Sequence, residues 1–226
     1  MALCTGNSCH ITQPNDVAVL KDGPMEIGDI YMVCAAVKHP LLDRLRNSSR
    51  RTVGTCLSTL MEDSLRMCRK KAARQAGWPC LICGTSTVTG DELPRICLMR
   101  IFETSEIDTM PAMLRHYLVP VYISDSKHDD HLHTSPEWPG KSQQWVVAAP
   151  FVPPEGSLSK RLKTPSSSKW PNGSNHYIGG SAMQKFMCLC QDKVVTWESQ
   201  SCSAYLHNLA KINVCISEKY FDRNKN

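Results

Sequence analysis

A helix signal spanning Leu57–Ala76 is the feature that most constrains how this chain folds. Thr59 and Glu62 have the spacing of a capping box, in which each side chain accepts a hydrogen bond from the other residue's backbone N–H. Gly77 can adopt the left-handed conformation that ends a helix, and Pro79 cannot continue one. We expect this segment to be the longest helix, buried along one face. The residues of that face recur at intervals of three and four: Leu57, Met61, Leu65, Cys68 and Ala72.

The helix leads into the sequence Cys-Leu-Ile-Cys-Gly at residues 80–84. Two thiolates separated by two residues can bind one tetrahedral zinc ion, and a following glycine lets the backbone turn around it. A structural zinc needs four ligands, so the other two must come from elsewhere in the chain. The predicted zinc ligands are Cys80, Cys83, Cys97 and His131, with His128 and His133 as alternatives to the histidine.

The same cysteine spacing also has simpler explanations. The chain has 12 cysteines, enough for such a pair to arise by chance. A plain pair of buried or surface thiols at Cys80 and Cys83 is therefore as good an interpretation as a metal site. A thioredoxin-type redox pair fits less well, because that motif follows a strand and precedes a helix, and here the predicted order is reversed.

The region from the helix to Ile123 combines a basic helix end, the cysteine pair and a Val-Pro-Val segment: Lys70–Arg74, Gly77, Cys80, Cys83, Gly84, Cys97, Leu98 and Val119–Val121. In these residues the region resembles a group of short fungal proteins, uncharacterised and related to MYND-type zinc fingers. The resemblance implies an intracellular protein-interaction role without catalysis. One departure is clear: residues 122–126, Tyr-Ile-Ser-Asp-Ser, stand where that pattern places a further cysteine pair.

Composition favours a protein of the cytoplasm or nucleus. The first residues lack the basic and apolar regions of a signal peptide, and no apolar run approaches the roughly 20 residues of a membrane-spanning helix. The formal net charge is only +5, and the single dense basic run, Arg66–Arg74, is typical of a solvated helix face. Trp78 is the only aromatic residue near that run, so nucleic-acid binding ranks below protein binding.

The pattern predicts an α+β fold: a small irregular domain with one long amphipathic helix and a few short strands. Residues 1–56 form an N-terminal lead-in, and residues 57–152 form the helix-plus-knuckle core domain. Residues 153–174 are rich in proline and serine and are predicted to be a disordered linker. Residues 175–226 form a C-terminal segment with a strand and a helix.

Several shorter elements are predicted from local patterns. Residues 27–39 suit a helix or a strand, residues 85–92 a polar loop, and residues 96–102 an extended segment. Pro111 begins a short helix that ends near Tyr117, and residues 118–123 form an edge strand. Residues 124–140 are predicted to be an exposed loop and residues 145–151 a buried strand. In the C-terminal segment, residues 193–197 are expected to form a strand and residues 203–213 a helix.

Two functions follow from these observations. The first is a non-catalytic intracellular protein-interaction module, stabilised by a degenerate zinc knuckle. The second is an accessory protein or enzyme of a fungal metabolic pathway, with Cys80 as a candidate reactive thiol. The second has no motif behind it, because Gly-x-Ser-x-Gly, His-Glu-x-x-His and Gly-x-Gly-x-x-Gly are all absent from the sequence.

Overall fold

The computed structural model describes residues 23–47, 66, 77–88, 91–121, 131–135, 138, 142–163 and 175–198. The predicted helix Leu57–Ala76 lies outside these residues, except that Arg66 is helical. The predicted helix at residues 203–213 also lies outside them.

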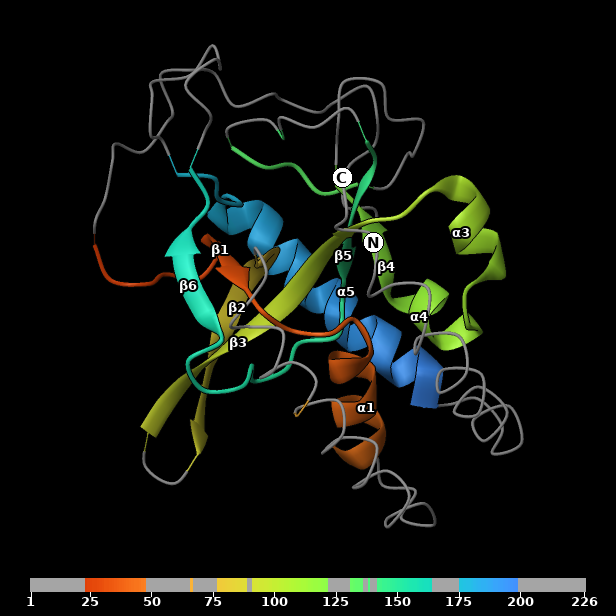
Figure 1. Cartoon of the computed structure of the whole chain (residues 1–226), viewed down its shortest axis with the longest axis horizontal. Coiled ribbons are helices and arrows are strands. Elements are labelled where there is room, and N and C mark those ends of the chain that lie inside the picture. The colour runs from red at the N-terminus through yellow and green to blue at the C-terminus, as the bar shows by residue number, and fades with distance from the viewer. Residues whose placement is uncertain are drawn as a thin grey trace.

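The described residues form a mixed α+β structure organised around one six-stranded sheet (Figure 1). The strand order is β4-β5-β3-β2-β1-β6, and every neighbouring pair is antiparallel. The strands are β1 (Ile30–Val33), β2 (Trp78–Val88), β3 (Asp91–Ile101), β4 (Leu118–Pro120), β5 (Gln144–Val147) and β6 (Leu158–Arg161). The helices are α1 (Lys38–Asn47), α3 (Thr104–Thr109), α4 (Ala112–Tyr117) and α5 (Gly180–Glu198).

The middle of the sheet is buried on both faces. Because successive side chains of a strand point to opposite faces, β2 sends Cys80 and Ile82 to one side and Leu81 and Cys83 to the other. Two hydrophobic clusters result. The α1-side cluster includes Val33, Leu41, Cys80, Ile82, Ile96, Leu98, Tyr117, Trp145 and Trp197. The α5-side cluster includes Ile30, Leu81, Cys83, Cys97, Met99, Val146, Met183, Phe186 and Cys190.

Helix α5 crosses behind the sheet in Figure 1 and contributes to both clusters. Its buried residues follow the helical repeat at intervals of three and four: Met183, Phe186, Cys190, Val194 and Trp197. The predicted strand at residues 193–197 is therefore wrong. Short apolar runs such as Val194-Val195 suit a strand locally, but the buried stripe over 19 residues has the period of a helix.

The prediction of a small domain with few, short strands also needs correction. β2 and β3 each have 11 residues and pair almost along their whole length. Thr85, Ser86 and Thr87, which were expected in a polar loop, lie opposite Pro94, Leu93 and Glu92. These residues lie where the hairpin extends beyond the core, so polar side chains there remain compatible with a strand.

Other local predictions are confirmed. Residues 96–101 are extended within β3. The strand predicted at residues 145–151 is confirmed in part, because β5 covers Gln144–Val147, all buried, and residues 148–150 lie outside any strand. Pro111 precedes the short helix α4, which ends at Tyr117. β4 is the terminal strand at one side of the sheet, as expected from Pro120, whose nitrogen has no hydrogen to donate.

Two segments predicted to be loose contribute to the packed structure. Within residues 153–174, β6 pairs with β1, so the linker prediction does not hold for residues 158–161. Within residues 124–140, His131, Leu132, Thr134 and Ser135 are buried. Val121 forms a bridge with Leu132, and Ser135 forms one with Tyr177, so backbone pairing holds this part of the loop against the rest of the fold.

Among the described helices, none combines the length and the apolar character that a membrane crossing requires.

Packing on α5 can be tested with one buried and one exposed residue of the same helix. Phe186 is fully buried in the α5-side cluster, whereas Val195 is 58% exposed. Phe186→Ala is expected to lower the free energy of unfolding by about 3–5 kcal/mol, because it removes buried surface and leaves a cavity. Val195→Ala should change it by less than about 0.5 kcal/mol. Urea denaturation measures both, and equal effects would contradict the packing described for α5.

Candidate functional site

The predicted zinc ligands Cys80 and Cys83 lie on β2 and belong to different hydrophobic clusters. Cys80 packs in the α1-side cluster and Cys83 in the α5-side cluster. Residues three apart along an extended strand project to opposite faces, so the Cys-x-x-Cys spacing separates these side chains instead of gathering them. Burial raises the pKa of the Cys80 thiol, with a further contribution from Cys83, which keeps the thiol protonated.

Cys83 instead packs with two other thiols. Cys97 of β3 hydrogen-bonds with Cys190 of α5 and with Cys83 of β2, all within the α5-side cluster. Cys83 also donates a hydrogen bond to the Leu81 carbonyl oxygen, at 3.4 Å. Burial, followed by these hydrogen bonds, raises the pKa of Cys97 well above its usual value. Cys97 is therefore a protonated, enclosed thiol, which is chemically inert and acts as a small packing residue.

His131, the fourth predicted ligand, is paired with another histidine. Its Nε2 atom lies 2.9 Å from Nε2 of His133, a distance at which one ring donates a hydrogen bond to the other. Burial, with a smaller contribution from His131, lowers the pKa of His133 to about 4. The neutral His133 ring has one N–H and one unprotonated nitrogen, so it can either donate or accept this hydrogen bond, depending on its tautomer.

The structure thus brings together Cys83 and Cys97 of the predicted ligand set, and places Cys80 in the other cluster. Within the part of the chain that the structure describes, no group of three or more His, Cys, Asp or Glu side chains is arranged to hold a metal ion. The described residues therefore do not assemble the predicted zinc site. The presence of zinc remains a prediction.

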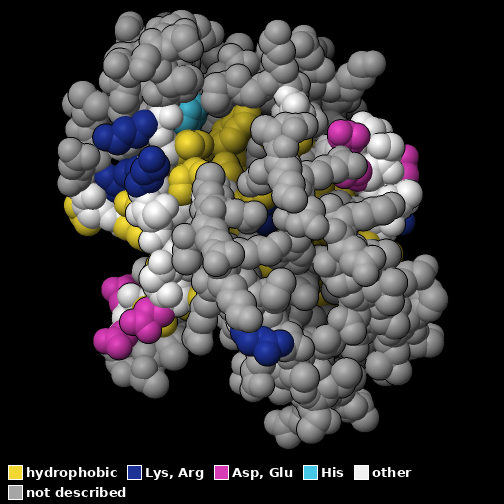
Figure 2. Space-filling model, viewed as in Figure 1, with side chains coloured by type: hydrophobic (Ala, Val, Ile, Leu, Met, Phe, Trp, Pro, Cys, Tyr) yellow, Lys and Arg dark blue, Asp and Glu magenta, His cyan; other side chains and the backbone are white. Residues whose placement is uncertain are grey.

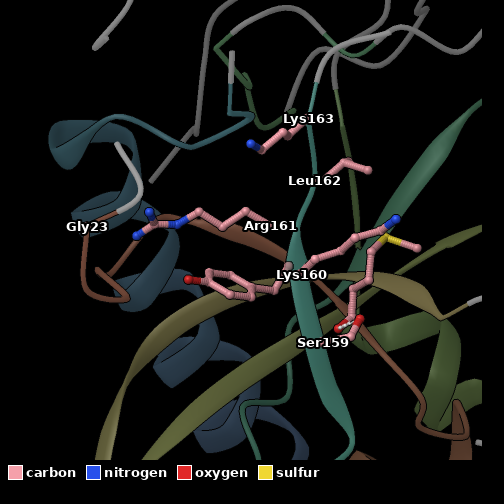
Figure 3. A pocket seen from close by; sticks show the side chains of 8 residues that line it. Gly23, Ser159, Lys160, Arg161, Leu162 and Lys163 are labelled. Atoms are coloured by element: carbon pink, nitrogen blue, oxygen red, sulfur yellow. Dashed lines mark hydrogen bonds between the residues drawn. The ribbon is translucent and has the colours of Figure 1, made fainter. Parts of the chain in front are cut away.

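A cleft of about 620 Å³ lies beside β1 and β6. A volume of this size is in the range that binds drug-sized ligands or short peptide segments. Tyr31 and Met32 of β1 contribute apolar surface, and β6 with the following residues contributes most of the positive charge. The lining residues are Gly23, Tyr31, Met32, Ser159, Lys160, Arg161, Leu162 and Lys163 (Figure 3).

Arg161 links the two strands that form the cleft. Its Nη2 and Nε atoms donate hydrogen bonds to Oδ2 of Asp29, at 2.7 and 3.2 Å, and Nη2 also donates to the Pro24 carbonyl oxygen. The guanidinium carbon lies 5.5 Å from the centre of the Tyr31 ring. Burial raises the pKa of Tyr31, an effect that Arg161 opposes and Asp29 supports, so the phenol stays protonated at neutral pH.

Lys160 and Lys163 give the cleft its positive character. Both are exposed, whereas Arg161 is half-buried and balanced by Asp29. Figure 2 shows Lys and Arg side chains gathered at the upper left, next to hydrophobic surface, with acidic side chains on other parts of the same face. Among the described lining residues there is no Asp, Glu, His or Cys, so they supply cationic and apolar contacts without an acid–base pair.

Sequence reasoning missed this cleft because it assigned Lys160, Arg161 and Lys163 to the linker. The sequence carries only a weak signal for β6, because the pairing of this strand with β1 is irregular. A register shift between the pairs Tyr31–Arg161 and Val33–Leu158 marks a bulge in the β1–β6 pairing. Leu158 consequently packs against the α1-side cluster and Leu162 against the α5-side cluster, although their even spacing would place both on one face of a regular strand.

No protein-family model, no curated protein and no solved structure matches this chain. The resemblance to MYND-related fungal proteins therefore stays an expectation from sequence.

The packing of the thiols can be tested by alkylation. Cys188 is exposed on α5 and Cys190 is buried two residues later, within the same tryptic peptide. Iodoacetamide is expected to modify Cys188 in the native protein and Cys190 only much more slowly, because Cys190 is enclosed by the α5-side cluster. Mass spectrometry locates the label. In guanidinium chloride both should react alike, and rapid native labelling of Cys190 would contradict the buried cluster.

The zinc prediction is tested by elemental analysis of the purified chain beside a Cys80→Ser variant. If the predicted site forms, the unmodified protein contains zinc and the variant loses it, since thiolate ligands are needed at such a site. A metal-free protein that unfolds with unchanged stability in the presence of a chelator would overturn the prediction.

Proposed function

We propose that this chain is a non-catalytic protein-interaction module whose partner contact is the basic cleft beside β1 and β6. The observation that carries this proposal is the combination of exposed Lys160 and Lys163 with the apolar surface of Tyr31 and Leu162 in one cavity. Apolar contacts exclude water from an interface, and charges at its rim select the partner and speed association.

The positive cleft favours an acidic partner segment. Its described lining has three basic side chains and no acidic one, and the charge of Arg161 is balanced by Asp29. Lys160 and Lys163 are the exposed basic side chains of this lining. A carboxylate near either lysine gains a modest Coulomb attraction, which salt weakens because the lysines are exposed.

Hydrogen bonds from Ser159 and Arg161 fix the β6 backbone that carries the cationic residues. Ser159 donates a hydrogen bond to the Met32 carbonyl oxygen at 3.2 Å, and Arg161 ties β6 to Asp29 beside β1. Such cross-strand bonds keep the backbone of β6 in place before a partner arrives, which lowers the ordering cost of binding.

Charge reversal tests this proposal. The probe is a fluorescein-labelled peptide of alternating Glu and Thr, and binding is followed by fluorescence anisotropy. The double variant Lys160→Glu/Lys163→Glu is expected to raise the Kd roughly tenfold or more, because each reversal replaces an attraction worth ~0.2–1 kcal/mol by a repulsion. Salt should weaken binding to the unmodified chain far more than to the variant.

A matched control variant changes the net charge by the same amount at positions outside the cleft. Arg115 on α4 and Lys185 on α5 are both exposed and do not line the cleft. The double variant Arg115→Glu/Lys185→Glu is expected to bind the peptide nearly as well as the unmodified chain. Equal weakening in both double variants would show that only overall charge matters and would overturn the assignment to this cleft.

A further inference from the structure

The backbone of β6 adds a second kind of recognition to the cleft. β6 is the terminal strand of the sheet opposite β4, so one of its two edges faces away from β1. In an antiparallel ladder, residues of a non-hydrogen-bonded pair direct their own N–H and C=O groups away from the partner strand. The direction of the backbone groups of β6 therefore follows from its register.

Two positions on β6 point outward by this criterion. Arg161 is opposite Tyr31, and the flanking N–H of Leu162 donates to the Ile30 carbonyl oxygen at 2.8 Å. Leu158 is opposite Val33, and Cys34 N–H donates to the flanking Ser157 carbonyl oxygen at 3.0 Å. Arg161 and Leu158 thus both occupy non-hydrogen-bonded pairs, and their backbone amides face the outer edge of the sheet.

Basic side chains stand on both sides of this edge. Figure 3 shows Arg161 and Lys163 projecting to one side of β6 and Lys160 and Leu162 to the other. A segment laid along the outer edge would meet positive charge on each of its faces. The bulge between the Tyr31 and Val33 pairs lies within that edge, between the two outward-facing amides.

We infer that an acidic, extended segment of a partner protein binds along the outer edge of β6 as an additional strand. The inference rests on the proposed function and specifies the form of the partner. Main-chain hydrogen bonds supply affinity in this mode of recognition, and side chains on alternating faces supply specificity. The short length of β6 limits the paired segment to a few residues.

The positive charges beside β6 favour an acidic partner segment over a second copy of this chain. Two copies of β6 pairing edge to edge would bring the exposed Lys160 and Lys163 of one copy close to the same residues of the other. Like charges on neighbouring strands destabilise pairing, and lysines on edge strands are a common protection against self-association. An acidic strand converts the same residues from repulsive to attractive contacts.

Amide hydrogen exchange on the full-length, isotopically labelled chain tests the inference, with the same Glu-Thr peptide as probe. At saturating peptide, exchange at the Leu158 or Arg161 amide should slow roughly tenfold or more, because an amide in a ladder exchanges only when the pairing opens. Leu162, whose amide already donates to Ile30, is the internal control and should change little.

The outcomes separate the two proposals. Peptide binding that depends on Lys160 and Lys163 but leaves exchange at both Leu158 and Arg161 unchanged would overturn strand addition and leave the interaction module standing. Binding that is unaffected by Lys160→Glu/Lys163→Glu, or an absence of binding, would overturn both. Concentration-dependent dimerisation with slowed exchange at Leu158 in the absence of peptide would identify a second copy as the occupant and also overturn the inference.

Discussion

Burial of the β2–β3 hairpin on both faces is the constraint on which the described structure depends. Leu81 and Cys97 are opposite each other and point to the α5 side, while Ile82 and Ile96 are opposite each other and point to the α1 side. All four are at most 2% exposed. A strand buried on both faces needs a cover on each side, because exposing either row would return apolar surface to water at ~25 cal/mol per Å². The helices α1, α4 and α5 supply that cover.

The cleft lies where this two-sided burial comes to an end. Ser159 and Lys160 of β6 are exposed, in contrast to the buried centre of the sheet, so polar and charged side chains are tolerated there. The contact between Asp29 and Arg161 joins β1 to β6 across 132 residues of sequence, and both side chains are largely shielded from solvent. Shielding strengthens a charge-assisted hydrogen bond relative to one in water, although desolvation opposes part of the gain. The lysines, which are exposed, remain directed toward whatever approaches the edge.

Sequence patterns located many of the elements, and each failure has a physical cause. The apolar run at residues 96–101 and the strand at residues 145–147 were predicted because buried strands read as continuous apolar stretches. The α5 stripe from Met183 to Trp197 was visible in the sequence, but the short run at residues 193–197 was interpreted alone as a strand. β6 was missed because its bulge breaks the alternation by which a strand is recognised.

The sequence by itself determined an α+β chain with apolar segments that must be buried. Tertiary structure decided which of these residues meet. The zinc pattern placed Cys80 beside Cys83, yet strand alternation separates them and brings Cys83 to Cys97 and Cys190 instead. Likewise, Tyr31 and Lys160 line one cleft only because β1 pairs with β6. Pairing and register depend on contacts between residues far apart in sequence, and local patterns of apolar and charged residues do not specify them.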